Sequence, residues 1–472
     1  MKLARSLRAL VPAQIRSVSM TSNNSKASQA TSVGDVIPPP RTRDSSQQPS
    51  LARLPLSNVL RSLCILTASS SPLLLRPSIS VLSALSNPRT RLMDVSRNPV
   101  LHWLVKNTIY KQFSAGENKD EVQQSIAEIK KLGHRGVLLG YARELLVKDN
   151  EANVHDEAIA RKEVDAWLQG TLKTVDMVSQ GDFVALKLTG MGQQAVHRLR
   201  HRLPPTDFMD AAIRSACDAA ISKQARILVD AEEQAVQPGI DEWVMRYQEY
   251  CNKRTPGTAT LYGTYQAYLK STPATLARHL AMAESRGFTL GVKLVRGAYL
   301  RTEPRHLIWD TKADTDRCYD GIVEALLTRR YNSILRPHEA GSDKSIPLAN
   351  LLIASHNRDS VLKAQALRLK QAEAGEQRVP VAYAQLQGMA DEVSFELMDG
   401  LSDGSNSTVD HSGTTERTEV YKLLTWGTVP ECMGFLFRRA VENTEAVGRT
   451  KDSQMAMALE LRRRIGRVFS WR

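Results

Sequence analysis

The sequence predicts an α/β fold, and within that class a (β/α)₈ TIM-like barrel with an N-terminal helical extension. Eight short β-rich runs alternate with longer helical stretches between residues 131 and 450. Most runs are almost continuously apolar, which is typical of parallel strands buried on both faces. Several runs also end in polar or reactive residues, as strands do at the carboxyl face of a barrel, where catalytic groups lie.

The predicted elements follow one another in regular order. The strands cover residues 136–142, 183–190, 226–232, 258–269, 289–298, 349–357, 380–388 and 420–426. Helical segments lie between them, at residues 197–203, 209–220, 273–285, 315–329, 360–373 and 430–444. Polar tracts at 337–345 and 402–417 interrupt the pattern, and the second is predicted to be an exposed disordered loop because it has no apolar face. Eight such units fit a barrel better than two halves of a dinucleotide-binding fold.

The N-terminus has the composition of a mitochondrial transit peptide. Asp35 is the first acidic residue, and five Lys or Arg, many Ser and Thr and spaced leucines precede it. A disordered basic tail is the alternative, whereas a secretory signal fits poorly because no unbroken apolar run is present. The predicted organisation is a transit peptide at 1–34, a linker at 35–50, a helical region at 51–130, the barrel at 131–450 and a C-terminal helix or tail at 451–472.

The charge of the chain is concentrated at its N-terminus. The formal net charge is +13, but residues 1–100 carry +10 of it and the remaining 372 residues only +3. A nucleic-acid-binding surface requires a basic folded body, so nucleic acid is not an expected partner.

No metal centre or disulfide framework is predicted. The five cysteines are scattered, and none forms a pair with the spacing of a zinc site. The uncharged stretch Ser62–Leu75 contains Pro72 and has 14 residues, too few to span a bilayer. It could lie on a membrane surface, but a buried helical hairpin is the commoner structure for such a segment.

Residues 190–195, Gly-Met-Gly-Gln-Gln-Ala, match the dinucleotide-binding pattern between a predicted strand and a helix. Two observations argue against that function. Lys187 lies within the preceding strand, and the acidic residues about 20 positions further on, Asp207 and Asp210, lie in a helical context. A Rossmann fold is therefore the weaker alternative.

A pair of arginines near the C-terminus is a candidate anion site. On a helix, Glu442 lies one turn from Arg438 and Arg439, so the three residues share a face. Paired guanidinium groups at a barrel mouth would bind a small carboxylate or a phosphate. In isolation, a solvated helix with an ion pair explains the same pattern.

Two predicted strand ends carry further candidate binding residues. Lys293 and Arg296 flank an apolar pair, and Gly297 follows where the strand would end. Cations at this edge suit an anionic cofactor, and glycine permits close backbone approach. Residues 355–357, Ser-His-Asn, place three hydrogen-bonding side chains at another strand end. Surface cations and a structural histidine are the alternative interpretations.

Taken in order, these motifs resemble the proline dehydrogenase family. The resemblance covers residues 95–450 and has the character of the mitochondrial branch. The matching segments are ALKLTG at 185–190, VDAE at 229–232, YQAYL at 265–269, KLVRGAY at 293–299, ASHN at 354–357, QLQGMAD at 385–391 and RRAVEN at 438–443.

The resemblance implies a distorted (β/α)₈ barrel that holds FAD. It implies oxidation of L-proline, or a similar cyclic imino acid, by hydride transfer to flavin N5, which gives 1-pyrroline-5-carboxylate. Electrons would then pass to ubiquinone at the mitochondrial inner membrane, whose surface is a further possible partner.

The resemblance also assigns cofactor residues. Lys293 matches the cation beside flavin N5, and Gln266 the residue that hydrogen-bonds the isoalloxazine. Arg296 and Gly297 match positions near the pyrophosphate. Ser355, His356 and Asn357 match further FAD contacts, and Glu442 matches a residue on the sugar side of the cofactor.

The substrate residues come from the same comparison. Lys187, Arg438 and Arg439 match a clamp for the substrate carboxylate, and Asp230 matches a carboxylate that orients the clamp. Tyr299 and Leu386 match the apolar walls over the substrate ring.

The chain departs from the family pattern at two positions. Leu423 stands where the family's last strand carries a tyrosine that closes over the substrate, and Phe435 replaces a second tyrosine before the arginine pair. Two hydroxyl groups are thus missing from the expected ring pocket. The alternatives are therefore a dehydrogenase of hydroxyproline or pipecolate, or a non-catalytic flavoprotein.

Overall fold

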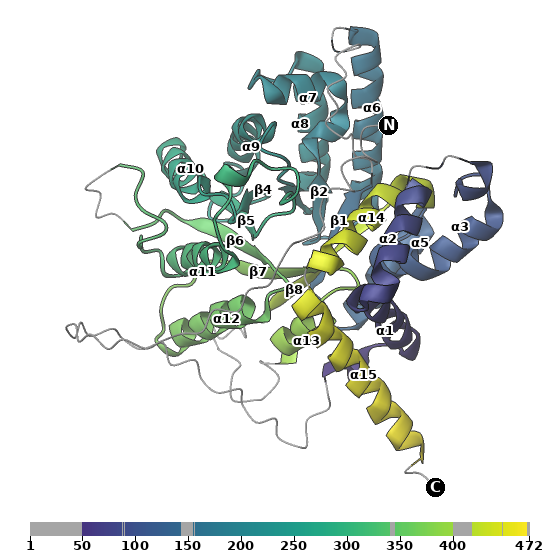
Figure 1. Cartoon of the computed structure of the whole chain (residues 1–472). Coiled ribbons are helices and arrows are strands. Elements are labelled where there is room, and N and C mark those ends of the chain that lie inside the picture. The colour runs from purple at the N-terminus through teal and green to yellow at the C-terminus, as the bar shows by residue number, and fades with distance from the viewer. Residues whose placement is uncertain are drawn as a thin grey trace, which may run out of the picture. The chain divides into compact units, whose positions relative to one another are not determined.

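The eight strands close into one parallel barrel, which confirms the predicted α/β barrel architecture. In this computed structural model each strand pairs with the next along the chain, and β8 pairs with β1 (Figure 1). The structure describes residues 50–86, 88, 90–142, 154, 156–339, 345–399, 418–445 and 447–469. The predicted transit peptide, the linker except for Ser50, the tract at 402–417 and part of the tract at 337–345 lie outside these residues.

All eight predicted strands are present; seven are shorter than predicted, and β8 begins one residue earlier. The strands are β1 Gly136–Tyr141, β2 Phe183–Leu186, β3 Arg226–Val229, β4 Leu261–Gln266, β5 Leu290–Val295, β6 Ala349–Ala354, β7 Val381–Leu386 and β8 Glu419–Trp426. Most runs were predicted too long at their carboxyl ends, because the residues that follow each strand continue into loops or short helices at the barrel mouth.

Helices surround the barrel, and further helices precede β1 and follow β8. The N-terminal region holds η2 Ser50–Arg53, α1 Leu56–Ser70, α2 Pro72–Ser86, η3 Arg91–Met93, α3 Pro99–Val105, the π-helix η4 Lys106–Tyr110, α4 Lys111–Phe113 and α5 Lys119–Lys131. The barrel carries α6 Glu157–Met177, η5 Leu188–Met191, α7 Gln193–Arg200, α8 Asp207–Ser222, α9 Gln237–Asn252, α10 Thr272–Arg286, η6 Arg305–Leu307, α11 Lys312–Thr328, α12 Arg358–Glu373, α13 Asp391–Asp399, α14 Val429–Glu445 and the C-terminal α15 Val447–Phe469.

Side chains alternate between the inside and the outside of the barrel. The interior is filled by one apolar cluster that includes Phe183, Tyr262 and Tyr421. Their rings meet edge to face, with centroids 5.4 Å apart for Phe183 and Tyr262 and 5.3 Å apart for Phe183 and Tyr421. Two larger clusters lie between the strands and the surrounding helices. The barrel is therefore a packed core and not a pore.

The last helix of the barrel does not take the usual place beside β8 and β1. Helix α5, which precedes β1, packs against that strand on the outside. Helix α14 instead packs mainly against α2, η4, α1 and α15 (Figure 1). The position of α14 therefore depends on the N-terminal helices that pack against it.

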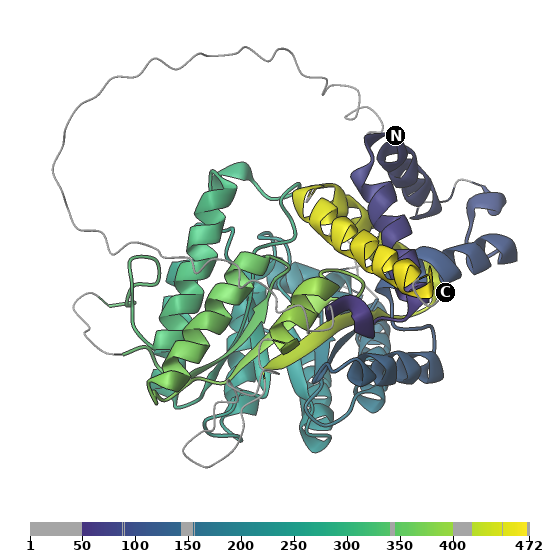
Figure 2. The same cartoon turned by 90° about the horizontal axis from the view of Figure 1, so that it is seen from below.

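The N-terminal and C-terminal helices form one layer. Helix α1 packs along α15, and Figure 2 shows these two helices side by side although they lie at opposite ends of the described chain. The interior of this layer contains Leu51, Val59, Phe395 and Met457.

The predicted buried hairpin at 62–75 is only partly buried. Leu73 is 86% exposed and Leu74 is 50% exposed, because α2 turns one face towards α14 and the other towards solvent. Among the described residues no single helix is long and apolar enough to cross a membrane, and α1 and α2 satisfy such a test only as a pair bent by 101°.

The structure gives the glycine-rich segment at 190–195 a packing role. Gly192 has a φ of +115°, and a Cβ atom there would come within 2.0 Å of the Glu163 carboxylate. The same carboxylate accepts a hydrogen bond of 3.0 Å from the Gln193 amide at the start of α7. An acidic side chain thus occupies the position where a dinucleotide phosphate would bind in a Rossmann fold.

Candidate active site

The inward-facing strand positions gather polar side chains at the carboxyl end of the barrel. Phe183, Leu228, Tyr262 and Ala382 belong to the interior cluster. Positions two or four residues further along these strands point the same way, since strand side chains alternate with a period of two. These positions hold Lys187, Asp230, Gln266 and Leu386. Lys293 pairs in register with the inward-facing Leu352 and therefore also faces inside.

Asp230 and Lys293 form an ion pair at the centre of this group. The Lys293 Nζ atom lies 2.8 Å from the Asp230 Oδ1 atom, and their side chains are 6% and 21% exposed, respectively. Burial alone would raise the pKa of the Asp230 carboxyl. The pKa is nevertheless lowered, because the charges of Lys293, Lys187 and Arg439 favour the carboxylate. One carboxylate therefore faces three cations.

Arg439 reaches this group from α14. Arg439 is only 9% exposed, and its guanidinium carbon lies 5.1 Å from the centre of the Phe435 ring. Its charge helps to lower the pKa of the Asp230 carboxyl at the end of β3, so this part of α14 lies near the carboxyl end of the barrel. Arg438, the next residue on the same helix, is half-buried. The structure thus brings Lys187, Asp230, Lys293 and Arg439 together.

Gln266 joins this group to the neighbouring loops. The Gln266 Nε2 atom donates to the Glu232 carbonyl at 3.0 Å, and the Ala298 amide donates to Gln266 Oε1 at 3.4 Å. The side chain is therefore held between the ends of β3 and β5, with little freedom to turn.

Arg296 is fixed by three separate partners. Its Nε atom lies 2.8 Å from Asp316 Oδ1, Nη1 donates to Ser355 Oγ at 2.7 Å and Nη2 donates to Ser360 Oγ at 2.8 Å. The guanidinium also lies 4.3 Å from the centre of the Tyr319 ring. These contacts use three of its five N–H donors, so two remain for an anionic group.

Gly297 permits a close approach after β5. Its φ is +146°, and a Cβ atom would lie 2.4 Å from the Tyr268 ring. Any larger residue would push the backbone away from the site. Gly297 and Ala298 are exposed next to Arg296, whose two remaining donors would suit a pyrophosphate.

His356 and Asn357 have defined structural roles at the end of β6. The Leu386 amide donates to His356 Nε2 at 3.0 Å, which assigns the proton of the neutral ring to Nδ1. Asn357 is the N-cap of α12, and its side-chain oxygen accepts from the Ser360 amide at 3.2 Å. These contacts bind β6 to β7 and fix the start of α12.

The remaining predicted residues lie around this group. Leu423 is half-buried, packs on the interior cluster and pairs in register with Leu386. Tyr299 is half-buried in the loop after β5, and its carbonyl accepts from the Glu303 amide at 3.0 Å. Glu442 belongs to α14, but its side chain lies outside the part of the structure that is described.

Glu232 is a functional candidate that the sequence analysis did not single out. Its carboxylate accepts from the Thr189 hydroxyl at 2.6 Å and from the Thr189 amide at 3.3 Å, both within the buried interior. Its carbonyl also holds Gln266. The VDAE segment, which ends with Glu232, could have pointed to this residue. Only the fold shows that Glu232 joins the ends of β2, β3 and β4.

A buried ion pair on the outer side of β8 also went unpredicted. Lys422 faces away from the barrel interior, and its Nζ atom lies 2.7 Å from Asp391 Oδ1 and 3.1 Å from the Met389 carbonyl. The Gln112 Nε2 atom donates a hydrogen bond of 3.0 Å to the Gly388 carbonyl. The loop that follows Leu386 is therefore fixed from outside the barrel.

A sequence profile described as "Proline dehydrogenase" matches residues 122–452, which include the whole barrel and α14. The chain belongs to the proline dehydrogenase family. The resemblance seen in the motifs is thereby confirmed, and the family places the chain among oxidoreductases that act on cyclic imino acids.

Curated relatives include enzymes named for two substrates. The chain is 26% identical to a protein named probable mitochondrial proline dehydrogenase of Schizosaccharomyces pombe, over 87% of this chain and 89% of the relative. It is 27% identical to a hydroxyproline dehydrogenase of Bos taurus, over 77% of this chain and 82% of the relative.

Solved structures share the fold. A proline utilization A protein of Bdellovibrio bacteriovorus superposes with a TM-score of 0.54 at 16% identity, over 82% of this chain and 41% of that chain. A second such protein, of Bradyrhizobium japonicum, gives a TM-score of 0.52 at 16% identity, over 86% and 43%. This chain thus spans about two fifths of those longer proteins.

Replacement of Asp230 by Asn should destabilise the protein in a pH-dependent way. The variant leaves the three cations without their carboxylate, and loss of one partner of a buried pair costs about 3–5 kcal/mol, or less here because Asp230 is partly exposed. Since its folded-state pKa is lowered, Asp230 stabilises the protein above its unfolded pKa and ceases to do so as the pH falls through the folded value.

The difference in free energy of unfolding between the native chain and Asp230→Asn should be constant from about pH 5 to 8 and shrink towards pH 3. Urea unfolding at each pH measures it. Asp218→Asn is the control, because that exposed carboxylate pairs with Arg254 on the surface and should contribute about 1 kcal/mol at most. Equal effects of the two variants would contradict a central role for Asp230.

Proposed function

We propose that this chain is an FAD-dependent proline dehydrogenase that converts L-proline to 1-pyrroline-5-carboxylate and passes the electrons to ubiquinone. The observation that carries the proposal is the group of three cations around the Asp230 carboxylate inside the barrel mouth. Such a group suits a carboxylate substrate beside an anionic cofactor.

The proposed cofactor residues divide between two parts of the site. Lys293 and Gln266 would face the isoalloxazine, while Arg296, Gly297, Ser355 and His356 would lie near the pyrophosphate and the remaining cofactor. Asn357 would contribute by fixing the start of α12, and Glu442 is assigned by its motif alone. Bound FAD would supply hydride acceptance at N5 and the subsequent release of electrons.

The protein's own contribution is orientation and electrostatics. Lys187, Arg438 and Arg439 would bind the substrate carboxylate, with Asp230 as the positioning residue that keeps the cations in place. Tyr299, Leu386 and Leu423 would enclose the ring. A fixed substrate next to a fixed acceptor converts a bimolecular step into a unimolecular one. Lys293 would also stabilise negative charge that develops near it.

Absorbance spectroscopy of the purified holoenzyme tests this function. The protein should carry a flavin spectrum, release FAD on denaturation, bleach on addition of L-proline and recover when a soluble quinone is added. Lys293→Met should slow the bleaching by roughly 10²-fold, since one preorganised charge is worth about that much. Release of NAD instead of FAD, or a flavin that no cyclic imino acid bleaches, would refute the proposal.

Hydroxyproline and pipecolate are the alternative substrates. Hydroxyproline dehydrogenases occur among the relatives, and this chain departs from the family pattern in the ring pocket. Leu423 faces the barrel interior beside Leu386, so its side chain offers the ring only an apolar surface. We infer that the pocket favours unsubstituted rings, because a buried hydroxyl without a partner costs roughly 1–3 kcal/mol.

Relative kcat/KM values for four compounds check this inference. Proline and pipecolate should differ by about 1–3 kcal/mol, the usual effect of one methylene. 4-Hydroxyproline should be a poor substrate, and pyrrolidine nearly inert because it lacks the carboxylate. Leu423→Tyr should change the ranking, whereas Leu348→Tyr, outside the barrel interior, should not. Preference of the native chain for hydroxyproline would contradict the apolar pocket.

We further propose a mitochondrial location, with import directed by residues 1–34 and with the enzyme in the matrix against the inner-membrane surface. Relatives carry the word mitochondrial in their names. No acidic residue lies between Asp44 and Asp94. Most of the exposed large apolar side chains lie in this region, in α3 and in α15: Leu56, Leu60, Leu73, Leu74, Val81, Leu92, Val100, Trp103, Leu104, Met455, Leu459, Ile465, Val468 and Phe469. Apolar side chains among basic residues are typical of helices that bind an anionic bilayer surface.

Vesicle flotation measures this association. The protein should float with vesicles of phosphatidylcholine and phosphatidylglycerol, and less with phosphatidylcholine alone. Leu73→Ser with Trp103→Ser should weaken binding by roughly tenfold or more, because each side chain buries substantial apolar area. Leu203→Ser is the control, because Leu203 is exposed but lies between α7 and α8, outside the N-terminal helices and α15. Import of a fusion that lacks residues 1–34 would separately refute the targeting proposal.

A further inference from the structure

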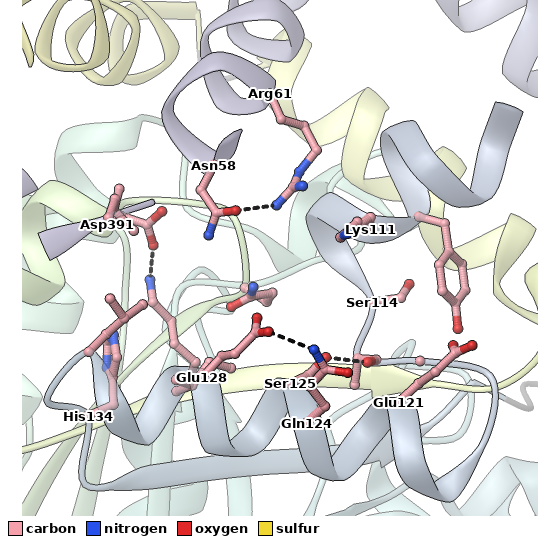
Figure 3. A pocket seen from close by; sticks show the side chains of 18 of the residues that line it. Asn58, Arg61, Lys111, Ser114, Glu121, Gln124, Ser125, Glu128, His134 and Asp391 are labelled. Carbon is pink, nitrogen blue, oxygen red and sulfur yellow. Dashed lines mark hydrogen bonds and ion pairs between the residues drawn. The ribbon is translucent and has the colours of Figure 1, made fainter. Parts of the chain in front are cut away.

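A polar cavity lies on the outside of the barrel, away from the proposed active site. Its volume is about 320 Å³, and its walls come from α1, the η4–α4 segment, α5 and the outer side of β8 (Figure 3). This volume is at the lower end of the range for sites that bind small molecules. None of the residues assigned to proline oxidation lines it.

Arg61 enters the cavity from α1. Its Nε atom donates to Gln112 Oε1 at 2.9 Å, and its Nη2 atom donates to Asn58 Oδ1 at 3.0 Å. Both partners are neutral amides, and no carboxylate of the described chain lies within ion-pair distance of Arg61. Burial lowers the pKa of this guanidinium, while the more distant charges of Glu128 and Asp391 oppose that effect. The side chain is thus held in place but keeps an unneutralised charge.

The cavity wall supplies two further groups that suit an anion. The exposed Lys111 begins α4 and Ser114 follows its end; both line the cavity, and Figure 3 shows Lys111 beside Arg61 and Ser114 below them. Ser114 is 6% exposed, and its hydroxyl has no hydrogen-bond partner among the residues that the structure describes. A buried polar atom without a partner is uncommon and indicates a missing ligand or water.

Helix α5 places negative charge on the floor of the same cavity. Glu121 is neutralised by Lys106, with 2.8 Å between its Oε1 atom and Lys106 Nζ. Glu128 accepts a hydrogen bond of 3.1 Å from Gln124, and no cation of the described chain pairs with it. The cavity therefore has an anion-binding wall opposite one available carboxylate.

We propose that this cavity binds a free α-amino acid. Its carboxylate would lie between Arg61, Lys111 and Ser114, and its ammonium group would face Glu128. Leu54, Ile129, Leu132 and Phe395 give the cavity an apolar part that suits an aliphatic side chain. Bidentate recognition of a carboxylate by arginine is favourable, and the opposing carboxylate disfavours a simple anion.

The charges disfavour other ligand classes. No group of three or more His, Cys, Asp or Glu side chains that could hold a metal ion occurs in the described chain. A nucleotide phosphate would meet Glu128 as well as Arg61. The proposal does not depend on which substrate the barrel oxidises.

Calorimetric titration with three matched probes tests the proposal. The probes are L-leucine, 4-methylpentanoate, which lacks the ammonium group, and 3-methylbutylamine, which lacks the carboxylate. The protein is the holoenzyme carrying Arg439→Met, so that binding at the proposed substrate clamp is weakened. L-Leucine should bind, and each partial probe should bind at least about tenfold more weakly, the usual effect of losing one charged hydrogen bond.

Two variants and a control locate the site. Arg61→Gln keeps hydrogen-bonding capacity but removes the charge, and should weaken L-leucine binding by roughly 10–100-fold. Ser114→Ala removes a hydroxyl that has no partner in the structure and should weaken binding by roughly 2–10-fold without loss of folding. Arg76→Gln, an exposed arginine on α2 that does not line the cavity, should have no effect.

Three results would overturn the proposal. The first is absence of any heat of binding with L-leucine, which would make the cavity a site for water alone. The second is equal binding of 4-methylpentanoate and L-leucine, which would exclude a role for Glu128. The third is unchanged L-leucine binding in both Arg61→Gln and Ser114→Ala. Flavin bleaching by proline is a separate readout, so each proposal can fail independently of the other.

Discussion

The ionised carboxylate of Asp230 is the interaction on which the site depends. Four charged side chains, from one strand, two strand ends and a distant helix, meet inside a low-dielectric barrel, and three of them are positive. Without a central negative charge the three cations would only repel one another. The same arrangement leaves an excess of positive charge that an anionic substrate and cofactor can satisfy, so the charge balance of the folded protein prepares it for binding.

This requirement explains the displacement of α14. Arg439 can act on Asp230 only if its helix crosses the carboxyl ends of the strands, which removes α14 from the position beside β8. Helix α5 packs on the outside of β1 near the position left open, and α2 supports α14. The N-terminal helical region is therefore part of the barrel's architecture, since it replaces one covering helix and holds another in place.

Strand positions could be predicted from the sequence because the strands are almost continuously apolar runs, and their ends because those runs stop at polar residues. Lys187, Asp230, Gln266 and Lys293 were found in this way or by motif, and the fold places them on the inner face. Contacts between distant segments could not be predicted. Glu232 with Thr189, and Lys422 with Asp391, become visible only when the barrel closes.

Other differences have a local physical reason. The assignment of Asn357 as a cofactor residue stays a prediction, and the fold adds that its side chain caps the start of α12. The segment at 62–75 looked like a buried hairpin because it is apolar, whereas the fold offers α2 a partner on one face only. An apolar composition predicts that a segment is buried, but it does not identify the element against which the segment packs.

The pairing of β1 with β8, and of α1 with α15, has a consequence for folding kinetics. Both contacts join segments separated by nearly the whole domain, so the average sequence separation of native contacts is large and folding should be slow. Because the chain is synthesised from its N-terminus, α1 and α2 are exposed before their C-terminal partners α15 and α14 have been made. Their leucines would then be the natural target of a chaperone that protects the unfinished barrel from aggregation.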